Sequence, residues 1–240
     1  SLINTNHEYA DQLVTGSGPD ELFYGMEKYS WDIFKSLSDM PIISALEKID
    51  TKYSLKAYKS ILNKDGLDLL EDIENDHYDL HKQISLICKN VYEAQRILSY
   101  ATITTQHMDL FNRMAKMFGL LHKAPYLDKD FVKLAFSIPV ERLINQETKN
   151  NKVEIGKFHL KRFLEKFMSK EHIYSQKIGF HAPVTRFIYE ENILKLIRDV
   201  DYSRLPSFLD IDKTKELVSN RISKFNMEDH FLYSFLYLSN

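Results

Sequence analysis

The sequence has little of several features that mark specialised classes of protein. It has one cysteine, Cys88, so no internal disulfide can form, and a reducing, cytoplasmic location with a buried, unreactive thiol is expected. Its 32 basic and 34 acidic residues leave no excess of positive charge, which disfavours nucleic acid as a partner. No apolar run approaches the roughly 20 residues that a membrane-spanning helix needs, so no membrane partner is expected. The densest apolar run, FLYSFLYL at residues 231–238, is typical of a buried terminal helix.

Strand signal is also scarce, and most of the chain is predicted to be helical. Apolar residues recur every three or four positions in several long segments. Examples are SWDIFKSL, DLLEDIENDHYDLHKQISLICKNVYEAQRILSYATI, DLFNRMAKMFGLL and KFHLKRFLEKFM. The best strand candidate is Gln12 to Thr15, which leads into a glycine-rich loop. The residues after that loop, in ELFYGMEKYSWDIF, are predicted to turn helical.

The loop stands out because the chain has only seven glycines, and two of them, Gly16 and Gly18, lie close together in TGSGPDELFYG at residues 15–25. Glycine is expected where the backbone takes a positive φ or lies against a ligand. A strand, a glycine-rich turn and a helix in this order present backbone N–H groups to an anion. Asp20 and Glu21 are placed to cap the helix or to hold Mg²⁺. The residues alone leave open both a structural turn and a phosphate or metal site.

Four stretches, in order along the chain, together resemble one known family. TGSGPDELFYG resembles the SGDGADELFGGY signature of the synthetase domain of glutamine-hydrolysing asparagine synthetases. NRMAKMFGLLHKAPYLD, at residues 112–128, is similar to that family's DRMSMAHGLEVRVPFLD. Residues 157–180, from KFHLKR to QKIGF, follow its KxxLR…RxKxGF segment, and FLYSFLYL matches its apolar terminal helix. The resemblance runs from about Asp11 to the carboxyl end and includes the related β-lactam synthetases.

The resemblance implies a fold class. The chain is expected to be a mostly α-helical fragment of an α/β domain of the adenine-nucleotide-hydrolase-like class, the PP-loop ATP pyrophosphatases. Residues 1–240 are expected to form a single synthetase-type domain that lacks its N-terminal pyrophosphate-loop portion. Residues 1–30 are expected to be a remnant of the nucleotide-binding sheet, and residues 31–240 the helical part.

The resemblance also implies a reaction. A carboxylate is activated by ATP as an acyl-adenylate, pyrophosphate leaves, and an amine then attacks the adenylate to form an amide. In asparagine synthetases the carboxylate is the aspartate side chain, so a small, aspartate-like carboxylate is the expected substrate. ATP and Mg²⁺ are the expected cofactors.

Roles carry over to the residues that match the family's motifs. The resemblance implies that Asp20 binds Mg²⁺ and that Gly16, together with Thr15 and Gly18, forms the ATP-binding loop. Lys177 matches a lysine that stabilises charge at the α-phosphate. A fixed cation suits this reaction, because adenylyl transfer accumulates negative charge on phosphate oxygens. Asp20 and Lys177 are therefore expected to open into one cleft.

The chain also departs from the family pattern. Ser17 stands where many members carry an acid that is a candidate for acid–base work in amide formation. A hydroxyl cannot replace a carboxylate as a base at neutral pH. Without a partner base, Ser17→Ala is expected to matter little. Leu121, Lys123 and Lys161 replace an acid and two arginines of the family, and lysine loses the bidentate fork of arginine.

The family's upstream pyrophosphate loop, SGGxDS, has no counterpart in this sequence, and neither has its glutaminase domain. The chain begins with Ser1 and Leu2 rather than with Met. We therefore expect a carboxyl-terminal portion of an amidotransferase-type ligase, inactive alone, whose partner is the missing N-terminal half or glutaminase domain. The alternatives are a degenerate member of the family and a non-catalytic helical subunit or regulatory module. Homo-oligomer formation is left open.

Histidines provide the remaining site candidates. His77 and His81 have metal-like spacing on a predicted helix, but a solvated polar face is the favoured interpretation. His122, His159 and His181 lie in or beside the segments that resemble the family. They are candidates for substrate contact, with an ordinary structural role as the alternative.

Overall fold

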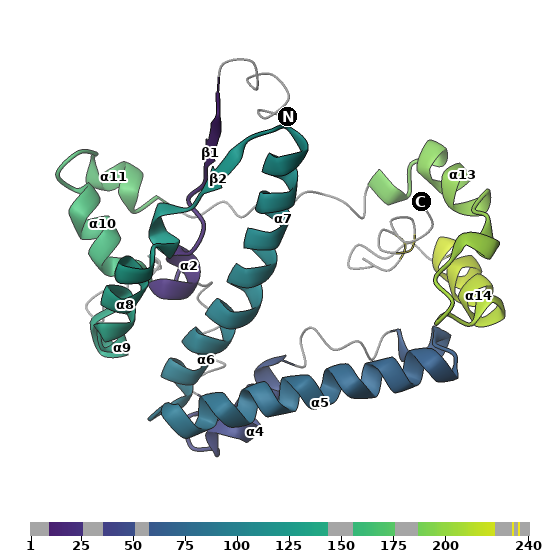
Figure 1. The fold of residues 1–240 in the computed structure, drawn as a ribbon, viewed down its shortest axis with the longest axis horizontal. Coiled ribbons are helices and arrows are strands. Elements are labelled where there is room, and N and C mark those ends of the chain that lie inside the picture. Colours follow the sequence, from purple (N-terminus) through teal and green to yellow (C-terminus); the bar gives the residue numbers. More distant parts are fainter. Residues whose placement is uncertain are drawn as a thin grey trace. The chain divides into compact units, whose positions relative to one another are not determined.

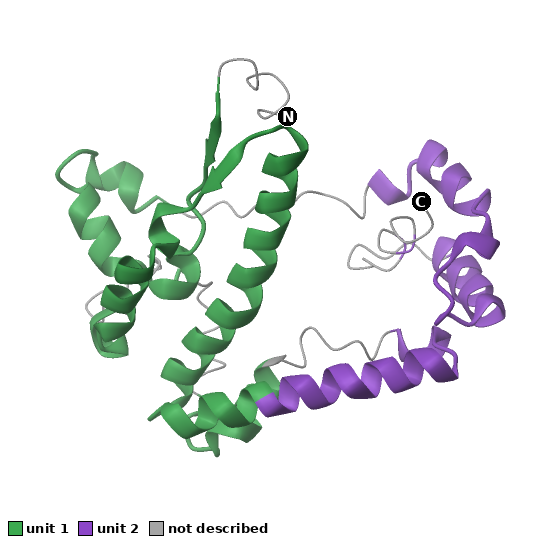
Figure 2. Cartoon of the chain, viewed as in Figure 1, with its two compact units in different colours: residues 1–50, 80–177 green, residues 51–79, 178–240 purple. Residues whose placement is uncertain are grey.

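The computed structural model of the chain describes residues 10–25, 36–50, 58–143, 156–175, 187–223, 232 and 235. These residues are mostly helical and include one small parallel sheet (Figure 1). They separate into two compact units (Figure 2). Unit 1 comprises residues 1–50 and 80–177, and unit 2 comprises residues 51–79 and 178–240. None of the described helices is long and apolar enough to cross a membrane.

Unit 1 carries both strands and most of the helices. Its elements are β1 (Gln12–Val14), α2 (Pro19–Leu22), α4 (Ile42–Asp50), α6 (Val91–Ser99), the π-helical turn η4 (Tyr100–Thr104), α7 (Thr105–Met117), β2 (Leu121–Lys123), the 3-10 turn η5 (Pro125–Leu127), α8 (Lys129–Ser137), α9 (Val140–Leu143), α10 (Phe158–Leu164) and α11 (Lys170–Ile173). Helix α5 (Lys64–Ile87) begins in unit 2 and ends in unit 1. Unit 2 also holds η3 (Lys59–Ile61), α13 (Glu191–Arg198), η7 (Tyr202–Arg204) and α14 (Ile211–Ile222).

Strands β1 and β2 form a parallel pair in which Leu13 lies opposite His122. Strand β1 confirms the strand predicted at the start of the glycine loop. Strand β2 was not predicted, because its sequence LHK has no alternating pattern and its extended shape comes from pairing with β1. Helix α7 leads into β2 through Gly119, whose φ of 68° reverses the chain after the helix. The pairing brings the residues after β2 beside the glycine loop.

The long helical segment predicted before the second strand is interrupted at residues 88–90. Helix α5 ends at Ile87, and a separate helix, α6, begins at Val91. Asn90 is the N-cap of α6, because its side-chain oxygen accepts the Glu93 backbone N–H at 2.9 Å. The Glu93 carboxylate in turn accepts the Lys89 backbone N–H at 2.8 Å. From there α6, η4 and α7 continue as one rod (Figure 1).

The two histidines on α5 were expected to lie together on a solvated face, but only one of them is exposed. His77 is exposed, but His81 is only 3% exposed. The reason is the amphipathic packing of the helix end in unit 1, where Ile84, one turn further on, is also buried. Among the described residues no group of three His, Cys, Asp or Glu side chains could hold a metal ion.

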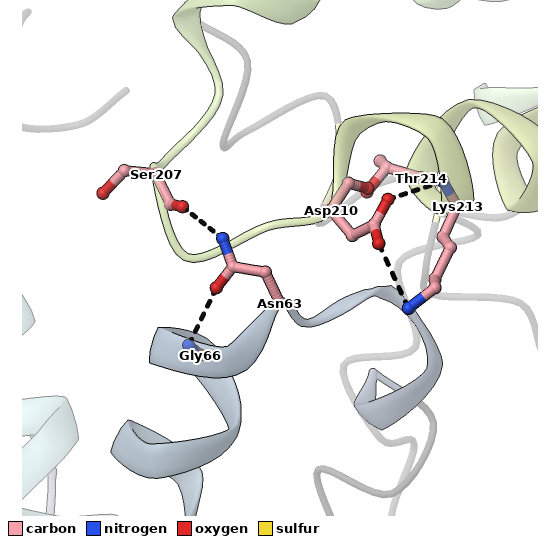
Figure 3. Close-up of polar contacts among 6 residues, drawn as sticks. All are labelled: Asn63, Gly66, Ser207, Asp210, Lys213 and Thr214. Atoms are coloured by element: carbon pink, nitrogen blue, oxygen red, sulfur yellow. Dashed lines mark hydrogen bonds and ion pairs between the residues drawn. The ribbon is translucent and has the colours of Figure 1, made fainter.

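Unit 2 has its own apolar core. The start of α5 is joined to the segment before α14 by an antiparallel bridge between Leu62 and Leu209. Figure 3 shows the polar contacts at this junction, where the Asn63 amide donates to the Ser207 carbonyl at 2.6 Å. Asp210 caps α14 by accepting the Lys213 backbone N–H at 3.1 Å. The core residues are Ile61, Ile188, Ile197, Leu205, Leu209, Val218, Leu232 and Phe235. The last two belong to the apolar terminal run, and their burial agrees with the expected terminal helix.

Candidate functional site

The glycine loop begins where β1 ends. The Thr15 backbone N–H donates to the Lys123 carbonyl at 2.9 Å, which ties the loop to the end of β2. Gly18 has a φ of 108°, and a Cβ there would collide with the Leu127 side chain of η5. Gly16 has no such constraint, since a Cβ there would meet nothing within 4 Å. The glycine requirement at Gly18 is therefore structural, whereas the space beside Gly16 can take a ligand.

Helix α2 is a single turn, shorter than the sequence predicts. It ends at Leu22 because the chain folds away at Phe23 and at Tyr24, whose φ is 54°. Leu22 and Tyr24 are fully buried in a cluster with residues of α8 and α9. The dipole of so short a helix is small and would attract an anion only weakly. Any anion at this helix would therefore be bound mainly by the backbone N–H groups of the first turn.

Buried Arg96, on α6, holds the loop in place. Its guanidinium donates to the carbonyls of Leu22 at 2.9 Å, Ala135 at 2.6 Å and Ile138 at 3.3 Å. It also stacks over the Phe136 ring, with 4.6 Å between its central carbon and the ring centroid. Burial lowers the pKa of Arg96 from its ordinary value. Sequence reasoning missed this residue, because a single arginine on a predicted helix gives no signal of burial.

Asp20 forms an ion pair with Lys157, with Oδ1 and Nζ 2.6 Å apart. Lys157 reaches it from the N-cap of α10, where its φ is 59° and its backbone N–H donates to the Phe23 carbonyl at 2.7 Å. Glycines permit this approach: a Cβ at Gly25 would overlap both side chains of the pair, and one at Gly156 would overlap the Tyr24 carbonyl. Lys157 opens the KFHLKR stretch of the sequence, but its role at Asp20 was not predicted.

Glu21, beside Asp20, is a second acid at the start of α2. Burial raises the pKa of the Glu21 carboxyl above its ordinary value, and the neighbouring Asp20 raises it further. Asp20 offers one carboxylate of the kind with which Mg²⁺ is usually held when phosphates supply further oxygens. This residue fits a Mg²⁺–nucleotide complex in which the ion would replace the Lys157 ammonium as its partner.

Ser17 lies at one end of a set of polar contacts that the sequence did not predict. Its hydroxyl oxygen lies 3.2 Å from Thr15 Oγ1, which lies 2.8 Å from His122 Nε2. His122 Nδ1 lies 2.9 Å from Asn112 Oδ1 on α7. The strand pairing explains the meeting, because Leu13 and His122 are partners and Thr15 projects to the same side of the sheet as Leu13. Burial lowers the pKa of His122.

Lys177 and His181 lie outside the described residues, so the expected meeting of Asp20 with Lys177 stays a prediction. His159, on α10, is exposed. Cys88 is half-buried at the end of α5, and this burial, with the nearby Glu93 charge, raises the pKa of its thiol to about 11. A thiol with that pKa is mostly protonated at neutral pH, as expected for an unreactive cysteine.

Comparison with known proteins gives one match. The family model described as asparagine synthase matches residues 8–236, nearly the whole chain. Neither the curated proteins nor the solved structures that were searched yield a match.

Proposed function

Because this chain belongs to the asparagine synthase family, we propose that it is the carboxyl-terminal portion of an ATP-dependent amide-forming ligase. In this proposal a small, aspartate-like carboxylate is activated as an acyl-adenylate with release of pyrophosphate, and an amine then displaces AMP. The observation that carries the proposal is the family match, which spans the glycine loop, β2 and the segment that contains Lys177. The corresponding fold class is that of the PP-loop ATP pyrophosphatases.

The geometry of the loop supports a nucleotide site. Thr15, Gly16 and Gly18 follow directly on a strand of a parallel sheet, and ligands bind at the carboxyl ends of such strands in open α/β sheets. The open space at Gly16 lets the backbone lie against a nucleotide. Lys177 is proposed to supply the fixed positive charge opposite this loop.

Asp20 is the residue of this chain proposed to hold Mg²⁺, with further ligands supplied from outside it. When bound, Mg²⁺ neutralises charge on the phosphate oxygens of ATP. In the described structure Lys157 Nζ lies at Asp20, so this lysine occupies the position of a cation and holds the carboxylate in place. For Asp20 to hold Mg²⁺, Lys157 would leave the carboxylate and the ion would take its place as the neighbouring positive charge.

The ion pair also favours a second candidate function. If Lys157 stays at Asp20 permanently, the chain is a non-catalytic helical subunit that keeps the synthetase fold. An Asp20→Asn variant separates the two functions. In the ligase it should weaken Mg²⁺-dependent ATP binding on the order of tenfold or more, because the neutral amide loses the attraction to a divalent ion. In the non-catalytic subunit, Mg²⁺ has no effect on nucleotide binding in either the original chain or the variant.

The proposed partners follow from the reaction. A segment with a pyrophosphate loop completes the nucleotide site, and a glutaminase domain supplies the amine. A reducing, cytoplasmic setting suits the single protonated thiol of Cys88.

The test is carboxylate-dependent exchange of labelled pyrophosphate into ATP, measured on this chain alone and on the chain joined to a family segment that carries SGGxDS. We expect no exchange by the chain alone and exchange after joining. A Lys177→Ala variant of the joined protein should lose the exchange. Exchange by the chain alone would contradict the need for a second segment, and none in either state would favour the non-catalytic subunit.

A further inference from the structure

Four polar side chains in unit 1 form one continuous chain of hydrogen bonds. It runs from Ser17 to Thr15, then to His122 and on to Asn112, with heavy-atom distances of 3.2, 2.8 and 2.9 Å. The residues come from three elements, namely the glycine loop, β2 and α7. Asn112 is exposed, whereas the other three side chains are half-buried. Such a chain can pass a proton along its length if each member has a donor and an acceptor in the right order.

The distances alone allow either direction for these hydrogen bonds, and the order is assigned from the Asn112 end. The Asn112 Oδ1 atom can only accept, so the hydrogen of the neutral imidazole resides on Nδ1. Nε2 then presents a lone pair and accepts the Thr15 hydroxyl hydrogen. The Thr15 oxygen is left to accept the Ser17 hydroxyl hydrogen. Burial favours the neutral form of His122, so before the reaction Nε2 carries a lone pair rather than a proton, and the same burial makes the imidazole a weaker base than it is in water.

The packing around the imidazole keeps this order. The Phe111 ring lies against His122, with 5.6 Å between ring centroids, and limits the rotation of the histidine. The pairing of β1 with β2 fixes the backbone on both sides of the Thr15 contact. At the other end Ser17 lies between Gly16, where space is open, and Gly18. The chain of hydrogen bonds therefore ends beside Gly16, where the adenylate is proposed to lie.

We propose that Ser17 and Thr15 relay the proton of the attacking amine to His122 in the amide-forming step, with Asn112 holding the imidazole in the accepting tautomer. The inference rests on the function proposed above. The amine nitrogen bonds to the carbonyl carbon of the acyl-adenylate and passes a proton to Ser17 Oγ. The Ser17 hydrogen moves to Thr15, and the Thr15 hydrogen moves to His122 Nε2. The bond from the carbonyl carbon to the AMP oxygen then breaks, and AMP leaves with the electron pair.

In the relay the base that finally takes the proton is His122, because a serine hydroxyl alone is too weak a base. A serine hydroxyl gives up its proton only when a better base takes it, and imidazole is such a base near neutral pH. Ser17 is the catalytic residue, since it touches the amine. Thr15, His122 and Asn112 act through it. The same contacts would be present if they only held the ends of β1 and β2 together. The tests must therefore distinguish a proton relay from a purely structural role.

The first test is spectroscopic and uses the chain itself. Long-range nitrogen–proton NMR of the His122 ring at neutral pH should show a hydrogen on Nδ1 and none on Nε2. Thr15→Val should shift the Nε2 resonance, whereas Thr15→Ser, which keeps the hydroxyl, should leave it near its original position. A hydrogen on Nε2 would overturn the proposal, because the relay would then run in the wrong direction.

The second test uses the joined ligase and separates the two half-reactions. His122→Val should lower amide formation on the order of 100-fold, the usual contribution of acid–base catalysis, and leave pyrophosphate exchange unchanged. Thr15→Val should lower amide formation at least as much, and its exchange does not serve as a control because Thr15 belongs to the proposed ATP-binding loop. Valine is the residue that the family segment quoted above carries in place of His122, so folding should be retained. The double variant should be no slower than Thr15→Val alone, because both changes break the same relay. Thr15→Ser and the exposed control His159→Val should keep amide formation near its original rate.

Each outcome has a distinct meaning. Amide formation unchanged in both valine variants overturns the relay and leaves the ligase intact. A parallel loss of exchange and amide formation in His122→Val identifies a purely structural role for these contacts and also overturns the relay. If the unmodified joined protein shows no pyrophosphate exchange, the proposed function itself fails, and the relay in amide formation fails with it.

Discussion

The glycines of the loop have different physical reasons for being glycine. Gly18 needs its positive φ, Gly25 makes room for the Asp20–Lys157 pair, and Gly16 has neither constraint. A residue without a structural reason to be glycine, in a loop that follows a strand, is best explained by a ligand that lies against its backbone. This contrast among neighbours supports the proposal that a nucleotide lies at Gly16.

The contrast leads to a paired prediction. Gly16→Ala should change the free energy of unfolding by less than about 0.5 kcal/mol but weaken ATP binding by the joined ligase, since its Cβ occupies the space of the ligand. Gly25→Ala should instead lose on the order of 1–3 kcal/mol of stability, as overpacking does, because its Cβ separates Asp20 from Lys157. Denaturant unfolding and equilibrium ATP binding measure the two effects. Full ATP affinity in Gly16→Ala would argue that the loop is only a turn.

Glu21 gives a pH-dependent prediction. Its pKa is raised in the folded chain, chiefly by burial, so the folded state holds this proton more tightly than the unfolded state does. The contribution to stability is therefore present below the ordinary pKa of glutamate and is lost as pH rises through the raised value. Glu21→Gln should be more stable than the original chain at pH 7, and the difference should shrink toward pH 4. Unfolding curves at both pH values measure it, and a variant less stable at pH 7 would contradict the assignment.

At the scale of elements, the sequence and the structure agree where the information is local. The strand before the loop was predicted from a short apolar step next to glycines, and the helices from their apolar spacing. Strand β2 was not predictable in this way, because LHK becomes extended only by pairing with a strand far away in the chain. The same holds for the site: Gly16, Gly18 and Asp20 lie in one motif, whereas Arg96, Lys157 and His122 reach that motif only through folding.

Helix α5 tests whether packing or intrinsic propensity prevails. Gly66 is a poor helix former, and replacing it with alanine should by propensity gain about 1 kcal/mol. The added Cβ, however, would overlap the Phe208 carbonyl at the junction drawn in Figure 3. Gly66→Ala should therefore destabilise unit 2, by on the order of 1–3 kcal/mol. The exposed substitution Asp72→Ala on the same helix is the control, with an expected change below about 0.5 kcal/mol. A more stable Gly66→Ala variant would show that the junction yields easily.

At the scale of the whole molecule, the family match covers residues of both compact units. The loop, Arg96, Lys157 and the Ser17 to Asn112 hydrogen-bond chain all belong to unit 1. Lys177 lies outside the described residues. The described part of the site thus concentrates in one unit, and the reaction proposed for it is adenylation followed by amide formation.

Adenylation is the central claim, and the fate of a carboxylate oxygen tests it most directly. The joined ligase is supplied with ATP, an amine and aspartate labelled with ¹⁸O in its side-chain carboxylate, and the products are analysed by mass spectrometry. An acyl-adenylate passes one carboxylate oxygen to the phosphate of AMP, so we predict AMP that carries a single ¹⁸O together with unlabelled pyrophosphate. Amide formation that leaves the label in inorganic phosphate, with ADP as the nucleotide product, would contradict the account.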